Sequence, residues 1–174
     1  VSRVLGGLRL EIGDMLGLRD KGKYEFLIVT DFPQFEYSQE EKRYISAHHP
    51  FTMPYPEDIK YLKSAPERVR AQSYDVVLNG MELGCGSIRI HDQQIQKLVF
   101  EALGFSDQEI EERFGFMVNA FKYGAPPHGG FAFGLDRLVM LMLGCDSLRE
   151  VIAFPKNKEA VCVMTGAPDY VDRE

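Results

Sequence analysis

The chain has 174 residues, of which 45% are hydrophobic and 26% charged, and its formal net charge is −6. This length fits one globular domain, no apolar run approaches the ~20 residues of a membrane span, and the N-terminus does not read as a signal peptide. The acidic balance argues against a surface that grips RNA mainly through its phosphates, and cysteines without a C-x-x-C pair indicate reduced thiols in a cytosol rather than a zinc site.

The first half of the chain predicts a short helix followed by strand and loop segments. Apolar residues through 4–18 favour a helix, and the β-branched and aromatic run Phe26–Thr30 favours a strand. Asp31-Phe32-Pro33 is expected to end that strand, because proline cannot extend a central ladder. The charged stretch 36–45 is expected to loop over the surface, and the proline-rich stretch after it allows one short helical stretch around Asp58–Ser64.

The second half predicts a hairpin and several helices. Ser73–Ile90 reads as a β-hairpin, because Asn79-Gly80 favours a two-residue type I′ turn. Asp92 and Gly104 are expected to begin and end a helix. The remaining expected elements are a helix opened by a capping box at Ser106 and running to about Phe114, a helical segment Phe116–Tyr123, a strand and helix over 129–143, and short strands at Val151–Pro155 and Ala160–Met164.

The most informative feature is a glycine-rich strand that turns directly into an apolar helix, starting at Gly129-Gly130. The first turn of a helix exposes unpaired N–H groups and the positive end of the macrodipole, and Arg137 adds a cationic fork there. The pattern predicts a nucleotide site, carried by Gly134 and Arg137, that is neither the Walker nor the Rossmann pattern. Leu135 and residues 138–143 are expected in the core, and Asp136 is expected to be a helix-start residue.

The hairpin predicts a pair of carboxylates. A two-residue turn sets Val77 opposite Glu82 and Asp75 opposite Gly84, so that Asp75 and Glu82 are diagonal neighbours on one face. Such neighbours lie about 7–8 Å apart, close enough to share one magnesium ion that keeps its waters. On an exposed face the same two side chains would simply be solvated.

Arg89 is predicted to share this face only if the ladder is irregular. Strand alternation places Glu82 and Arg89 on opposite faces unless one extra residue lies between them. Gly84-Cys85-Gly86 is the expected place for such a bulge. An unbroken ladder with Arg89 pointing away from Glu82 would contradict the shared site, and a surface ion pair is the alternative role for the arginine.

The chain resembles the class II aminoacyl-tRNA synthetases, and within them the aspartyl-tRNA synthetases of bacterial type. Gly-Leu-Asp-Arg after the glycine strand looks like motif 3 of that class, and Phe121–Gly130, Ala47–Thr52, Tyr74–Asp92 and Asp146–Lys156 agree in order and spacing. The resemblance implies an α+β fold, part of the class II antiparallel sheet flanked by helices. Residues 1–20 would be the end of an inserted domain rejoining the core, and residues 21–174 the C-terminal portion of the catalytic domain. No candidate for motif 1, motif 2 or an anticodon-binding barrel is found.

The resemblance also implies roles for particular residues. Arg137 and Arg89 would be the catalytic arginines, with Arg89, His48 and His49 binding L-aspartate and His48 in direct contact with it. ATP would be bound by Glu82, Gly134, Leu135, Asp136 and Arg137, and Mg²⁺ by Asp75 and Glu82. Cys85 stands where the family usually has a glycine, a departure expected to be tolerated because cysteine is small.

The implied activity is a ligase that activates L-aspartate with ATP and transfers it to tRNA, in the cytoplasm and without a membrane. The tRNA would be held mainly by regions absent from this chain, and the family's homodimer would lack its motif 1 interface here. Alternatives are a catalytically incomplete fragment, a nucleotide-binding paralogue without ligase activity, and a relaxed enzyme that charges both aspartate and asparagine tRNAs. A sheet lacking its partner strands is expected to expose an edge and an apolar face.

Overall fold

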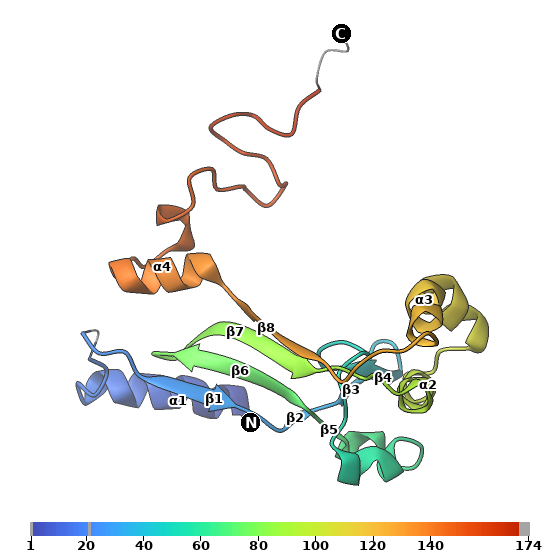
Figure 1. Ribbon diagram of the computed structural model, residues 1–174. Helices are drawn as coiled ribbons and strands as arrows, with labels where there is room; N and C mark the ends of the chain where they lie inside the picture. Colours follow the sequence, from blue (N-terminus) through green and yellow to red (C-terminus); the bar gives the residue numbers. More distant parts are fainter. Residues whose placement is uncertain (1, 21, 171–174) are drawn as a thin grey trace. The chain divides into compact units, whose positions relative to one another are not determined.

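The computed structural model describes residues 2–20 and 22–170 and divides into two units (Figure 1). One unit comprises Val1–Tyr24 and Phe133–Glu174, and the other comprises Glu25–Ala132. The first contains helices α1 (Ser2–Met15) and α4 (Leu135–Leu143) and the 3-10 helix Leu148–Glu150. The second contains β1 (Phe26–Val29), β2 (Phe32–Pro33), β3 (Phe35–Ser38), β4 (Arg43–Ser46), the 3-10 helices Pro56–Tyr61 and Pro66–Arg68, β5 (Arg70–Ala71), β6 (Ser73–Leu78), β7 (Met81–Ile88), α2 (Gln93–Ala102) and α3 (Asp107–Phe121), and strand β8 (Gly129–Phe133) crosses the boundary.

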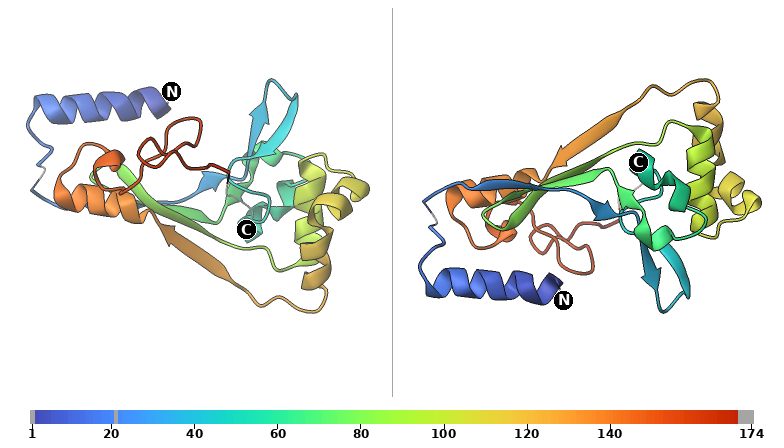
Figure 2. Two further views of the ribbon diagram at one scale, coloured as in Figure 1. Left: turned by 90° about the horizontal axis from the view of Figure 1, so that it is seen from above. Right: turned by 90° about the horizontal axis from the view of Figure 1, so that it is seen from below.

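A four-stranded sheet with the order β1-β6-β7-β8 is the main layer. The β1–β6 and β6–β7 pairs are antiparallel, and α2 and α3 lie together beyond one end of the sheet (Figure 2). The fold is therefore α+β with an antiparallel sheet and flanking helices, as predicted. Two further strand pairs, β2–β5 and β3–β4, extend the second unit.

The β6–β7 hairpin has the predicted turn and a bulge. Asn79 and Gly80 have φ of 51° and 83°, as a type I′ turn requires. Val77 lies opposite Glu82, but Val76 lies opposite Gly84, so Leu83 is the extra residue on β7. A bulge between Glu82 and Arg89 was expected within 84–86; the structure has it at Leu83.

The core of the second unit lies between the ends of the strands and α2. Its buried residues come from β3, the 3-10 segments, the end of β7 and α2, and are Phe35, Leu62, Val69, Ile90, Val99 and Leu103. Aromatic rings extend this cluster towards α3, where Phe100 and Phe114 stack with centroids 5.2 Å apart. The core thus holds the chain at Ile90, directly after Arg89.

Both helices of the second unit begin at the predicted caps. The Asp92 side chain accepts hydrogen bonds from the amides of Gln94 and Ile95, and Ser106 forms a capping box with Glu109. The predicted break after Phe114 is wrong, because α3 runs on to Phe121 as one helix. A glycine inside a helix costs only about 1 kcal/mol relative to alanine, so Gly115 does not end it.

Two other expectations are wrong. The charged stretch 36–45 forms the β3–β4 hairpin, in which Tyr37 and Tyr44 pair across the strands with ring centroids 5.5 Å apart. The strands expected near the C-terminus are absent from the described residues, where a single bridge joins Lys156 and Cys162. The Asn157 side chain accepts the amides of Glu159 and Val161 and so favours a turn there.

Several apolar residues are exposed, and one core prediction fails. All four residues of β1 are exposed, as expected for an edge strand with an uncovered face. On α4, Met140 is buried at 4% exposure, whereas Leu135 and Leu143 are 67% and 68% exposed. The prediction that all of Leu135 and 138–143 belongs to the core is therefore wrong, because Leu135, Met142 and Leu143 are exposed.

Candidate active site

One face of the β6–β7 hairpin, here called the site face, carries Asp75, Glu82, Ser73, Ser87 and Arg89. Directly opposed residues of an antiparallel pair share a face, and alternate residues along a strand return to it. Glu82 opposes Val77, Cys85 opposes Asp75, and Ser87 opposes Ser73. Because of the Leu83 bulge, Arg89 follows two residues after Ser87 on the same face as Glu82. The condition for a shared site is therefore met.

Asp75 and Glu82 are diagonal neighbours on the site face, as predicted, although Asp75 opposes Cys85 and not Gly84. The extra residue at Leu83 shifts the pairing by one. Burial raises the pKa of Asp75, the charge of Glu82 raises it further, and His48 opposes both effects. Two carboxylates that repel each other in this way are a natural place for a cation.

His49 contacts Arg89 directly. The Arg89 guanidinium lies 3.2 Å from His49 Nδ1 and closer still to Nε2, and Nδ1 also accepts the amide of Phe51 at 3.2 Å. A protonated imidazole has two N–H donors and no acceptor, so the ring that accepts the Phe51 amide is neutral. Burial lowers the pKa of His49, and the charges of Arg89 and His48 lower it further, which agrees with a neutral ring.

His48 lies at the acidic end of the site face. Its ring is exposed, meets Phe32 edge-on with centroids 5.0 Å apart, and interacts electrostatically with Asp75. The two adjacent histidines therefore lie at different ends of the site face, with His48 beside the carboxylates and His49 beside the arginine. Whether His48 touches a substrate stays a prediction.

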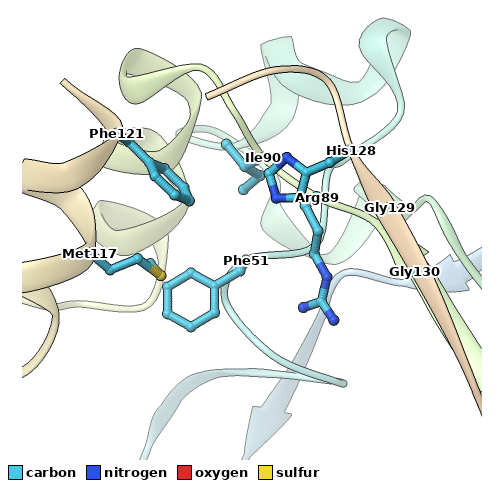
Figure 3. A pocket seen from close by; sticks show the side chains of 8 residues that line it. All are labelled: Phe51, Arg89, Ile90, Met117, Phe121, His128, Gly129 and Gly130. Carbon is cyan, nitrogen blue, oxygen red and sulfur yellow. The ribbon is translucent and has the colours of Figure 1, made fainter. Parts of the chain in front are cut away.

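A cavity of about 350 Å³ adjoins Arg89. Figure 3 shows Met117 and Phe121 of α3 on one side, and His128, Gly129 and Gly130 on the other, with the Arg89 guanidinium extending away from Phe121. The Arg89 amide donates to the His128 carbonyl at 2.9 Å, so the cavity wall also holds the arginine's backbone. An apolar cavity with a cationic rim suits a small anionic ligand.

The glycines of β7 belong to the opposite face. A Cβ at Gly84 would lie 2.3 Å from the Ala132 carbonyl oxygen, and one at Gly86 would lie 2.1 Å from that of Gly130. Cys85, between them, is exposed on the site face. This explains why a side chain is accepted at Cys85 but not at its neighbours.

Of the residues predicted to bind ATP, all but Glu82 belong to the first unit. Gly134 is the N-cap of α4 without a side-chain cap, and Asp136 lies in the first turn, as predicted. Leu135 and Arg137 begin the same helix and are exposed. Asp75, Glu82, His48, His49 and Arg89 all belong to the second unit, so a single site formed by both sets of residues stays a prediction.

The described part of the chain contains neither a metal-binding cluster of three or more side chains nor a membrane-spanning helix. No cluster of three or more His, Cys, Asp or Glu residues able to hold a metal occurs among residues 2–20 and 22–170. Mg²⁺ is commonly held by one or two carboxylates together with substrate phosphates, so the Asp75–Glu82 pair fits it without a third protein ligand. Within the same residues, no helix has the length and apolar character to cross a membrane.

Two serines at the centre of the site face were not foreseen. Ser73 and Ser87 oppose each other between the acidic pair and Arg89, are 4% and 3% exposed, and have hydroxyl groups without a hydrogen-bond partner among the described residues. Strand alternation could have found them, but only with the bulge correctly placed at Leu83.

The antiparallel sheet with its flanking helices has the architecture of the class II synthetases. A family model described as tRNA synthetases class II (D, K and N) matches residues 8–158, and the chain belongs to this family. An aspartate–tRNA ligase of Macrococcus caseolyticus is 60% identical over 172 residues, which are 99% of this chain and 29% of that protein. An aspartate–tRNA(Asp/Asn) ligase of Thermoanaerobacter sp. is 58% identical over 174 residues, 100% of this chain and 29% of the relative.

Solved structures show the same fold. An aspartyl-tRNA synthetase from Entamoeba histolytica matches with a TM-score of 0.62 at 24% identity, over 90% of this chain and 27% of the other, a likeness of fold alone. The asparaginyl-tRNA synthetase of that organism, solved with asparaginyl-adenylate, matches with a TM-score of 0.55 at 25% identity, over 78% of this chain and 26% of the other. The chain thus spans less than a third of the proteins that it resembles.

Proposed function

We propose that this chain is part of an aspartate–tRNA ligase and supplies its aspartate-reading arginine and one side of its ATP site. The observation that carries the proposal is the common face of Glu82 and Arg89, created by the Leu83 bulge, with His49 on the guanidinium. The names of the relatives at 60% and 58% identity support the choice of aspartate.

Arg89 would bind the side-chain carboxylate of L-aspartate through paired hydrogen bonds. A hydrogen bond to a charged group contributes roughly 1.5–3 kcal/mol, about ten- to a hundredfold in affinity. Asparagine would leave the guanidinium without its counter-charge, so the site would reject it by binding alone. The neutral His49 suits this role, because it orients Arg89 without competing for the carboxylate.

Asp75 and Glu82 would hold Mg²⁺ against the phosphates of ATP, and the ion would neutralise charge on those phosphates. Arg137, with Gly134, Leu135 and Asp136 at the start of α4, would bind the nucleotide. Placing charges in advance where phosphate charge develops is the main catalytic resource in such reactions.

The proposed reaction has two steps. The α-carboxylate of aspartate attacks the α-phosphorus of ATP, the bond to the bridging oxygen breaks, and aspartyl-adenylate and pyrophosphate form. A ribose hydroxyl of the terminal adenosine of tRNA then attacks the acyl carbon, and AMP leaves. The 174 residues lack recognisable motifs 1 and 2, so we expect this chain alone to be inactive.

A second candidate is a ligase that charges both aspartate and asparagine tRNAs. Several relatives, among them the one at 58% identity, carry the name aspartate–tRNA(Asp/Asn) ligase. Charging assays with the two tRNAs would separate the candidates, because both would activate aspartate in the same way.

The test is aspartate-dependent exchange of pyrophosphate into ATP. The complete translation product of the gene should catalyse it with aspartate and not with asparagine, and the 174-residue chain should not catalyse it. Exchange by the complete product with lysine or asparagine in preference to aspartate would contradict the proposal.

A further inference from the structure

The segment Pro50–Pro54 follows the histidine pair and runs beside the end of β7. The edge of the segment that faces β7, here called its inner edge, forms backbone hydrogen bonds with residues 88–90. The Ile90 amide donates to the Phe51 carbonyl at 2.9 Å, and the Met53 amide donates to the Ile88 carbonyl at 2.8 Å. Thr52 forms an antiparallel bridge with Arg89. The position of Arg89 on the site face therefore depends on how firmly this segment is held.

The outer edge of the segment has acceptors and almost no donors. The carbonyls of Pro50, Thr52 and Pro54 alternate with those used on the inner edge. Prolines have no N–H, and the Thr52 amide turns back to the His49 carbonyl at 3.4 Å. A neighbouring strand, which needs both donors and acceptors, could not pair with such an edge.

Three glutamine side chains from separate parts of the chain occupy this edge: Gln34 between β2 and β3, Gln72 between β5 and β6, and Gln96 on α2. Gln96 of α2 donates to the Pro50 carbonyl at 2.8 Å, Gln34 to the Thr52 carbonyl at 2.9 Å, and Gln72 to the Pro54 carbonyl at 2.9 Å. Gln34 and Gln96 are 2% and 4% exposed. Each uses its amide nitrogen as a donor, whereas the oxygens of Gln34 and Gln96 have no partner among the described residues.

We propose that Gln34, Gln72 and Gln96 are positioning residues that hold the Pro50–Pro54 segment and, through it, the His49–Arg89 pair in the geometry that reads the amino-acid substrate. Their side-chain N–H groups donate to the carbonyls on the outer edge of the segment, which lack backbone donors as partners in the described part of the chain. Gln34 and Gln96 each bury an amide oxygen without a partner among the described residues, which costs free energy. Methionine or leucine would fill the same space without that cost. This inference rests on the proposed aspartate-binding function of Arg89.

The experiment uses the complete translation product with Gln34→Met, Gln72→Met and Gln96→Met, singly and together. Methionine keeps the size and flexibility of glutamine but cannot donate. We expect the KM for aspartate in pyrophosphate exchange to rise about three- to tenfold for each buried glutamine, at most the tenfold that 1.4 kcal/mol represents. The KM for ATP should stay within about twofold. Gln94→Met, at an exposed glutamine on the same helix, is the matched control.

A second readout does not depend on activity. Amide hydrogen exchange at Met53, Arg89 and Ile90 should quicken in the variants while the α2 amides keep the wild-type rate, which also shows that each variant is folded. Equal changes in the KM values for both substrates, or unchanged KM and unchanged exchange, would overturn the inference. If the wild-type product activates no aspartate, the proposed function fails, and unchanged amide exchange would then overturn the positioning role separately.

Discussion

The guanidinium of Arg89 lies against the imidazole of His49, and the imidazole nitrogen 3.2 Å from the arginine also accepts the Phe51 amide. The arginine is thus oriented by a neutral ring that is itself fixed by the backbone. Such an arrangement leaves the full positive charge of Arg89 for an anion.

Arg89→Lys should impair aspartate use far more than ATP use. Lysine keeps the charge but cannot form the paired hydrogen bonds of a guanidinium. We expect kcat/KM for aspartate in pyrophosphate exchange to fall about ten- to a hundredfold, with the KM for ATP within about twofold. Arg113→Lys, at an exposed arginine of α3, serves as the control. Comparable losses for both substrates would argue against this division of roles.

His49→Gln should flatten the pH dependence of stability. The folded state lowers the pKa of His49, so the unfolded chain takes up its proton first. The resulting stabilisation is complete above about pH 6.5, the ordinary histidine value, and is lost as the pH falls below it. Urea unfolding at pH 7.5 and 5.5 should show a smaller difference in the variant than in the wild type. His128→Gln, at an exposed histidine on the wall beside Arg89, is the matched control, and an unchanged difference in His49→Gln would contradict the assignment.

Asp75→Asn should stabilise the ligand-free protein while weakening nucleotide use. The pKa of Asp75 is raised by burial and by Glu82, so the folded state binds its proton more tightly and the carboxylate form opposes folding at neutral pH. At pH 7.5 we expect a rise in Tm of about 2 °C, which should disappear near pH 3 where the wild-type carboxyl is protonated. In the complete product, the KM for Mg²⁺–ATP should rise at least about tenfold, the loss of one charged contact. A fall in Tm at pH 7.5 would show that Asp75 is structurally satisfied.

Gly86→Ala should destabilise the sheet, whereas Cys85→Ala should not. A Cβ at Gly86 would lie 2.1 Å from the Gly130 carbonyl oxygen and 2.6 Å from the Tyr74 ring. Forcing atoms into such a space costs typically about 1–3 kcal/mol, which urea denaturation of the two variants would measure. Equal stabilities would mean that β8 is not held against β7 as described.

Local sequence signals predicted the elements that are governed by their own residues. Asn79-Gly80 determines its turn, and Asp92 and Ser106 cap their helices, because each acts within a few residues of itself. The bulge was predicted because Glu82 and Arg89 can share a face only with an extra residue between them. Its predicted position within 84–86 was wrong, because the pairing of β6 with β7 leaves Leu83 unpaired. No local pattern marks that choice.

Features that depend on distant contacts could not be predicted. The β3–β4 hairpin looks like a charged loop until Tyr37 is seen against Tyr44. The glutamines were missed because the carbonyls that they serve lie 18 to 46 residues away along the chain. The prolines at Pro50 and Pro54 were the available signal, since prolines four residues apart leave an edge of acceptors.

The Leu83 bulge determines which residues of β7 lie on the site face. With an even offset between Glu82 and the arginine the two would share a face of a regular strand, but their actual offset is odd, and one unpaired residue corrects it. If Leu83 instead paired with Val76 in a regular ladder, every later residue of β7 would move to the opposite face, exchanging the serine and arginine for the glycines and Ile88. One residue that touches no substrate thus decides whether the acidic pair and the arginine can act on the same molecule.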